Sequence, residues 1–133
     1  MANLIYPKAK EQLLQGGINM SSGDIRAILV DLADYTYNAA HNALDDVAAG
    51  SRVSVTATIG TKTFTDGLFA AANTVFTAAT GDISEAIILY LHTGVESTSL
   101  LIAFLDTGIT GIPVTPNGGN INVTWSGSGI FQL

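Results

Sequence analysis

The chain has 133 residues, of which 47% are hydrophobic and only 12% are charged, whereas about 25% charged residues is usual for a globular domain. Eleven acidic residues against five basic ones give a net charge of −6, and no basic residue follows Lys62. The second half therefore lacks the cations that neutralise phosphates, which argues against direct binding of nucleic acid or of an anionic membrane. Disulfides and thiolate metal sites are excluded because the chain has no cysteine.

The length predicts a single domain, residues 1–133, that buries roughly two-thirds of its unfolded surface. The low charge is open to two interpretations: a subunit that buries apolar surface against partners, or a compact monomer with a Thr, Ser and Asn surface. No run approaches the ~18 to 20 apolar residues of a membrane span. The first residues lack the basic and apolar regions of a secretory signal, so we expect synthesis in a cytoplasm without export.

The N-terminal segment predicts a short helix. Residues 8–15 are good helix formers, Pro7 suits a first helical turn, and two glycines follow. A helix of about two turns is not stable alone, so we expect it to dock through Leu13 and Leu14. It would pack either on its own domain or, as a docking segment formed by residues 1–16, on a neighbouring subunit.

The next part of the chain mixes strand and helix patterns. Residues 18–22 are compatible with a short extended piece, and residues 25–32 predict a strand. Residues 39–49 are compatible with a second short helix that Gly50 would end. Residues 52–59 alternate apolar and polar side chains, which is typical of a half-buried strand.

Three apolar runs in the second half predict the central strands. Residues 86–91 and 100–105 are apolar on both faces, so each must be covered by protein on both sides. Residues 121–125 alternate, with one face buried and one in contact with water.

The remaining segments predict turns and edge strands. Residues 63–65 and 68–78 flank an Asp-Gly turn and hold two or three short extended pieces. Residues 106–119 contain two prolines and four glycines, which predicts a long irregular connection of the kind that often makes contacts. The apolar residues 130–133 predict a final edge strand.

Eight or so short strands, with turn signals about every ten residues, indicate a mainly β fold. We expect an antiparallel β-sandwich or barrel, jelly-roll-like, with the short N-terminal helix and the optional second helix. No internal repeat of 20 to 50 residues is present, which excludes a solenoid.

The sequence offers little for catalysis. His41 and His92 lack a metal-ligand spacing. A hydrolase triad drawn from Ser97 or Ser99 with His92 and Asp106 has no nucleophile-elbow pattern to support it. We therefore predict no enzymatic activity and no cofactor.

Metal binding is not predicted either. Residues 80–82 and 106–108 could offer oxygens to Ca²⁺, but neither segment has the alternating acidic spacing of a calcium loop. The pair Asp45 and Asp46 is more typical of a solvated or helix-terminal position than of an acid/base device.

The interface candidates are apolar and aromatic residues. They lie in the two terminal segments, in the turn after the first long strand, in the long connection and, for Trp125, in the alternating strand. They are Leu13, Leu14, Tyr35, Tyr37, Ile109, Ile112, Pro113, Pro116, Trp125, Phe131 and Leu133. For Trp125, packing in the core and anchoring an interface are both open.

The order of motifs resembles small virion-associated proteins of tailed bacteriophages. The resemblance spans nearly the whole chain and is most specific in its last block, although relatives tend to have proline where this chain has Ala48. The matching segments are KAKE (8–11) with LL (13–14), LVD (29–31), ADYT (33–36), AGSRV (49–53), TDG (65–67), TG (93–94), STS (97–99), PVTPNGG (113–119), TW (124–125) and IF (130–131).

The resemblance implies a structural role in the virion. The first hypothesis is a capsid decoration or cement protein that binds the major capsid protein as a homo-oligomer. The second is a neck, collar or tail subunit stacked in rings, with residues 8–14 and the carboxyl terminus clamping adjacent copies. The third is a carbohydrate-binding β-sandwich that contacts the host surface through Tyr35, Tyr37 and residues 107–119.

Overall fold

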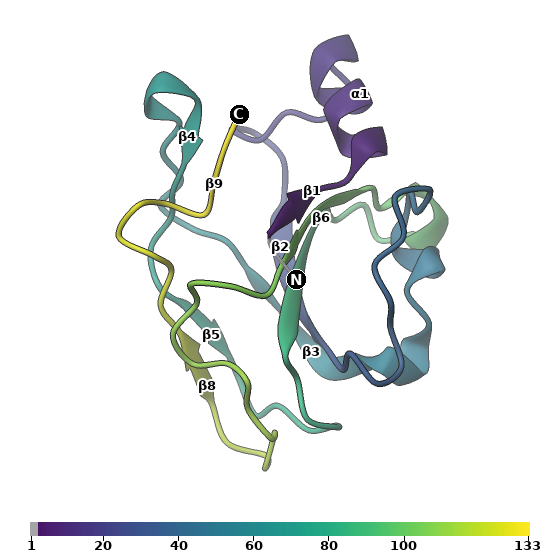
Figure 1. The fold of residues 1–133 in the computed structure, drawn as a ribbon, viewed down its shortest axis with the longest axis vertical. Coiled ribbons are helices and arrows are strands. Elements are labelled where there is room, and N and C mark those ends of the chain that lie inside the picture. The colour runs from purple at the N-terminus through teal and green to yellow at the C-terminus, as the bar shows by residue number, and fades with distance from the viewer. Residues whose placement is uncertain (1–2) are drawn as a thin grey trace.

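The computed structural model describes residues 3–133, and antiparallel strands dominate it (Figure 1). This confirms the predicted mainly β class with a helix near the N-terminus. The first two residues of the expected docking segment lie outside the described part. The elements are β1 (Leu4–Ile5), α1 (Pro7–Gln15), β2 (Ile25–Val30), η1 (Leu44–Asp46), η2 (Ala49–Ser51), β3 (Arg52–Thr58), η3 (Thr65–Gly67), β4 (Leu68–Phe69), β5 (Thr74–Phe76), β6 (Ala86–Leu91), η4 (Glu96–Thr98), β7 (Leu101–Leu105), β8 (Ile121–Val123) and β9 (Phe131–Gln132), where η denotes a single 3-10 turn.

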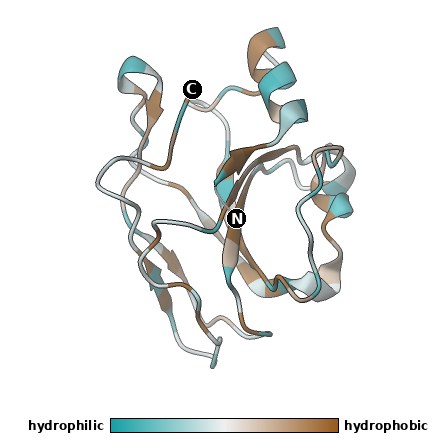
Figure 2. Ribbon diagram, in the orientation of Figure 1, coloured by the Kyte–Doolittle hydropathy of each residue, from teal (hydrophilic) through white to brown (hydrophobic). Residues whose placement is uncertain are grey.

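A five-stranded sheet with the order β1-β7-β6-β2-β3 forms the centre of the molecule. Ile88 of β6 pairs with Ile28 of β2 on one side and with Phe104 of β7 on the other. Every residue of β7, and β6 up to Tyr90, is buried, which confirms that both faces of these strands are covered. The hydropathy colouring in Figure 2 shows the same apolar centre.

One face of this sheet is covered by an irregular segment instead of a second sheet. The Phe104 ring lies 6.2 Å from Tyr35 and 5.6 Å from Tyr37, measured between ring centroids. Tyr37 in turn lies 5.1 Å from Tyr6, and the hydroxyls of Tyr6 and Tyr35 share a buried hydrogen bond of 2.7 Å. The turn after β2 is therefore fastened to the sheet by aromatic contacts and by this bond.

Two small sheets, β4–β9 and β5–β8, lie beside the central sheet (Figure 1). In β8 and its continuation, Ile121, Val123 and Trp125 are buried and the residues between them are exposed, as the alternation predicted. The terminal residues form β9, which confirms the expected edge strand. This layering is compatible with a sandwich.

Helix α1 begins at Pro7 and ends at Gln15, and Gly16 stops it as predicted. Gly16 has a φ of 82°, and the following backbone N–H donates to Gln12 O, which closes the helix. The helix packs on β7 of its own chain, through the buried Ala9. Leu13 is half-buried against the core, but docking of Leu14 on its own domain was wrong, since that side chain is 90% exposed.

The second helix expected over residues 39–49 does not form as one helix, and two 3-10 turns, η1 and η2, take its place. Asp46 Oδ2 accepts the backbone N–H groups of Asn42 and Ala43, and Asn38 Oδ1 accepts that of Ala40. Such local bonds compete with helical ones. Ala43 also bridges to Leu100, which extends the chain there.

Residues 18–22 form a turn and not an extended piece. Asn19 Oδ1 accepts the backbone N–H groups of Ser21 and Ser22, and Asn19 O accepts that of Gly23. An asparagine that bonds to the backbone two and three residues ahead favours a turn over a strand.

The connection 106–119 is irregular, as expected, but isolated bridges hold it in place. Thr110 pairs with Thr124, and Val114 pairs with Ser84. Within residues 3–133, none of the helices has the length and apolar character needed to cross a bilayer.

The indole of Trp125 gives a test of the small β5–β8 sheet. Its Nε1–H donates to Thr74 Oγ1 at 3.1 Å, and both side chains are buried. Thr74→Val should lower the free energy of unfolding by about 1 to 3 kcal/mol, because the indole N–H loses its acceptor. Thr58→Val, at an exposed position of β3, is the matched control, and equal losses in urea titrations of the two variants would contradict this assignment.

Candidate interaction surface

An open groove of about 560 Å³ lies between β1 with α1 on one side and the C-terminal strand on the other. Most of its lining is apolar, and among the described lining residues Lys10 alone carries a charged side chain. The lining residues are Asn3, Leu4, Ile5, Lys10, Leu105, Ile130, Phe131, Gln132 and Leu133.

The groove exists because two edge strands face it. Within the described chain, β1 pairs with β7 alone and β9 with β4 alone, so each strand has a free edge. Free edges combined with apolar side chains favour pairing with another chain. The floor includes Leu105, whose neighbour Phe104 contacts the aromatic cluster on the opposite face of the sheet.

A second, smaller hollow of about 90 Å³ continues the apolar surface. It shares Phe131 and Leu133 with the groove and adds Leu13, Met20 and Phe64. The side chains of Leu133 and Phe64 are 66% and 40% exposed, and α1 presents the still more exposed Leu14. We call α1, β4, β9 and both hollows the apolar end of the molecule.

The structure divides the interface candidates into three groups. Leu14, Leu133 and Pro113 are exposed. The half-buried candidates are Leu13, Phe131, Tyr37, Ile109 and Ile112. Tyr35 and Pro116 are buried in the chain itself and are corrected to core positions. For Trp125, which is buried as well, the structure agrees with the core alternative. Tyr35 is held there by Tyr6 and by His41 Nδ1, which lies 2.9 Å from its hydroxyl.

Sequence reasoning missed Leu4, Ile5, Leu105 and Ile130 as groove residues. They come from opposite ends of the chain and from a strand that looked like core. Only the pairing of β1 with β7 and of β9 with β4 brings them together. The alternation of apolar residues could not have revealed that pairing.

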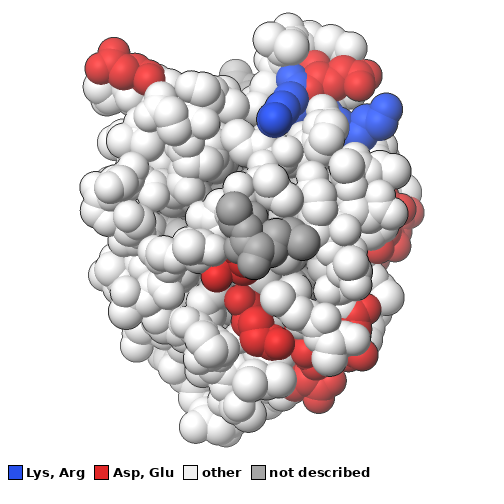
Figure 3. All heavy atoms as spheres, viewed as in Figure 1, with Lys and Arg blue, Asp and Glu red and all other residues white. Residues whose placement is uncertain are grey.

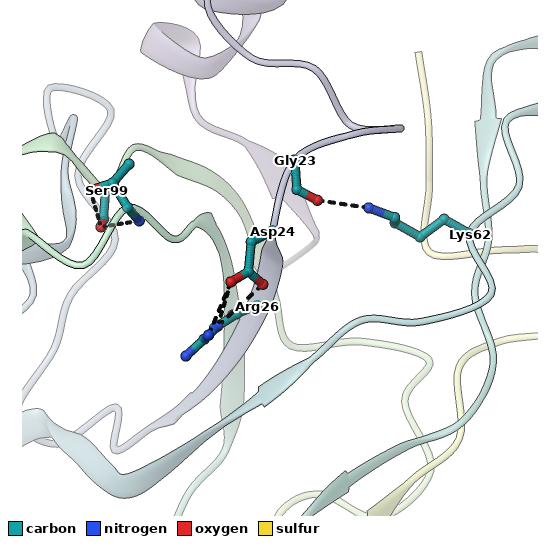
Figure 4. A network of polar contacts seen from close by, with 6 residues as sticks. Gly23, Asp24, Arg26, Lys62 and Ser99 are labelled. Atoms are coloured by element: carbon teal, nitrogen blue, oxygen red, sulfur yellow. Dashed lines mark hydrogen bonds and ion pairs between the residues drawn. The ribbon is translucent and has the colours of Figure 1, made fainter.

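Most of the basic side chains are used inside the chain. Arg26 pairs with Asp24 at 3.0 Å and Lys62 Nζ donates to Gly23 O at 2.9 Å, as Figure 4 shows. The hydrogen bonds that the Arg26 guanidinium donates to the Asp24 carboxylate raise the pKa of the guanidinium. Arg52 donates two bonds to Glu96, and this contact lowers the pKa of the Glu96 carboxyl.

The cations of α1 differ from these. Lys8 lies 3.8 Å from Glu11, with both side chains about half exposed, and such a contact contributes little. Lys10 forms no ion pair within residues 3–133. On the face shown in Figure 3, the basic side chains lie together at the α1 end, with acidic ones beside them and at the other upper corner, and further acidic side chains extend towards the opposite end.

Three carboxylates meet at the far end of β2. Oxygens of Asp31, Asp34 and Asp82 lie within 4.8 Å of one another. The sequence singled out Asp82 as an oxygen donor but not its two neighbours. Asp31 Oδ1 accepts the backbone N–H of Ala33, and acidic groups of this kind are common without an ion.

The hydroxyls considered for a catalytic triad have other partners. Ser99 Oγ bonds to the backbone of Thr93 and Val95 and lies 3.2 Å from Thr93 Oγ1. His41 Nδ1 contacts the Tyr35 hydroxyl. Among the described residues, no hydrogen bond joins Ser97 or Ser99 to His92.

Comparison of the chain with protein-family models and with curated protein sequences found no match. Among the described residues, the features that a binding partner can reach are the apolar end and the charged side chains around it.

The turn beside the sheet gives a pH-dependent prediction. Backbone N–H groups of Asn42 and Ala43 donate to Asp46 Oδ2 at 2.7 and 3.1 Å, and they lower the pKa of this carboxyl below its ordinary 3.8. Asp46→Ala should cost about 0.5 to 1 kcal/mol of unfolding free energy at neutral pH, towards the low end because the group is exposed.

A carboxyl with a depressed pKa stabilises the fold above its unfolded-state pKa and loses that contribution as the pH falls through its folded-state pKa. The difference between wild type and Asp46→Ala should therefore shrink below about pH 4. Asp45→Ala, at the exposed neighbouring position, is the control. Denaturant titrations at pH 7 and pH 3 measure the difference in unfolding free energy between wild type and Asp46→Ala. The same difference at both pH values would show that the charged carboxylate is not its cause.

Proposed function

We propose that the protein is a non-enzymatic structural subunit of a tailed-phage virion. Its role is that of a capsid decoration or cement protein, which contacts the major capsid protein as a homo-oligomer. The observation that carries the proposal is the apolar end, whose open groove has exposed apolar residues at its rim and one charged side chain among its described lining residues. The resemblance to virion-associated proteins supplies the setting.

An open apolar groove between strand edges suits a protein partner. Burial of one fully exposed leucine contributes about 1.5 to 3 kcal/mol, and Leu14 contributes nothing while it faces water. Large exposed apolar surfaces are typical of interaction sites. The sheet behind the groove is buried on both faces, so the surface is presented on a rigid support.

The charge distribution supports a position away from DNA. Acidic residues outnumber basic ones, and several of the basic side chains are held by partners within the chain. A decoration protein on the outer surface of a capsid needs no phosphate contacts. Stabilisation of the shell would come from area buried across neighbouring capsid subunits.

A neck, collar or tail subunit is the second candidate. It is favoured by the position of α1 and of β9 on the two sides of one groove, where both terminal segments could clamp an adjacent copy. The carbohydrate-binding hypothesis loses support, because Tyr35 lies in the core and cannot offer a ring to a sugar.

The proposal predicts that the purified full-length protein binds phage heads assembled without it, and not isolated tails. Leu14→Asp should weaken this binding at least about tenfold, since it places a charge in the apolar contact. Val95→Asp is the matched control, because Val95 is also exposed but lies next to η4, outside the apolar end. Binding is measured by co-sedimentation with the particles.

Saturable binding to tails alone would favour the second candidate over decoration. Equal binding by Leu14→Asp and wild type would remove α1 from the contact. Absence of binding to any virion component would overturn the structural role.

A further inference from the structure

The groove has a defined chemistry that its occupant must match. Its walls are apolar, and Lys10 has no ion pair within the described residues. A matching segment therefore needs an exposed apolar side chain beside an acidic one. It must also project from its own surface so that it can enter between β1 and β9.

The chain carries such a segment in the loop before β6. Ile83 is 46% exposed although it is a large apolar residue, and the neighbouring Asp82 is exposed as well. The two ends of this loop are fixed: Thr80 N and Oγ1 both donate to Ser54 Oγ, and Ser84 exchanges backbone bonds with Val114. A loop held at both ends loses little freedom on binding.

The loop does not fill the groove of its own chain. Leu105 in the groove pairs with Ile87, close to where the loop joins β6 at Ala86, yet no loop residue is among the described residues that line the groove. The bonds to Ser54 and Val114 hold the two ends of the loop in this position. The groove is therefore open to a second copy.

We propose that the Asp82–Ile83 loop of one copy enters the groove of the next copy. Ile83 packs against Leu4, Ile5 and Ile130, and the Asp82 carboxylate pairs with Lys10. The inference rests on the proposed function and deepens it by naming a second copy of this chain as the partner of the groove. Leu14 and Phe64 stay accessible for the capsid.

The charges select this orientation. Asp31 and Asp34 lie beside Asp82, so the loop end is strongly negative and repels another loop end. The groove offers the cation of Lys10, which attracts it. A contact between two different surfaces of one chain is heterologous, and it closes into a ring when the rotation between copies allows.

Charge exchange tests the contact. Lys10→Glu and Asp82→Lys should each weaken self-association of the full chain by about tenfold or more at low salt, because each places like charges opposite one another. An equimolar mixture of the two variants should associate like wild type. In the mixture, the groove of Lys10→Glu faces the loop of Asp82→Lys, so the two charges of this contact are exchanged. The groove of Asp82→Lys faces the loop of Lys10→Glu, and this contact keeps the native pair of charges. The double variant in one chain should associate as well.

Lys8→Glu and Asp45→Lys are the matched controls, since each makes the same change in net charge at an exposed position outside the proposed contact. Sedimentation equilibrium gives the association constants, and circular dichroism shows that each variant is folded. Wild-type protein that stays monomeric, or a mixture that associates no better than its components, would overturn the inference.

Failure of this contact can be told apart from failure of the proposed function. Monomeric wild-type protein that still binds phage heads would leave the virion role in place and assign the groove to another protein. Self-association that follows the charge-exchange pattern without any binding to particles would support the contact and remove the capsid role.

Discussion

The constraint that governs this structure is that β6 and β7 are apolar on both faces, so that protein must cover each side of the sheet. A chain of 133 residues is too short to supply a second large sheet for each face. It covers one face with the irregular segment after β2, fastened by Tyr35 and Tyr37 to Phe104. The strands near the C-terminus lie along the other face of the sheet.

The two faces of the sheet are covered to different extents, and this difference explains where the accessible surface lies. In the aromatic cluster, polar atoms have hydrogen-bond partners: the Tyr35 hydroxyl bonds to the Tyr6 hydroxyl and to His41 Nδ1. Burial and the contact with Tyr35 raise the pKa of the Tyr6 hydroxyl, so this hydroxyl stays neutral. On the other face, β9 reaches β4 and leaves a gap before β1. The groove lies at this gap, where Leu4 and Ile5 of β1 are only half-buried.

How much of this the sequence predicts depends on the range of the interaction. The runs that became β6 and β7, the alternation through Trp125, and the limits of α1 follow from local pattern and from Pro7 and Gly16. The turn at residues 39–49 does not, because carboxylate and amide bonds to the backbone outcompete the helical propensity of its alanines. The groove is the feature that the sequence predicts least well, because its two walls come from opposite ends of the chain and meet only through strand pairing.

Charge adds a direction to this apolar geometry. Arg26, Arg52 and Lys62 are held by partners within the chain, whereas Lys10 of α1 lines the groove and is available to a partner. The carboxylates of Asp31, Asp34 and Asp82 gather at the far end of β2. Exposed ion pairs contribute little affinity, so the apolar walls supply the energy and the charges decide which end fits. A fold with so few charges can therefore still distinguish its two ends.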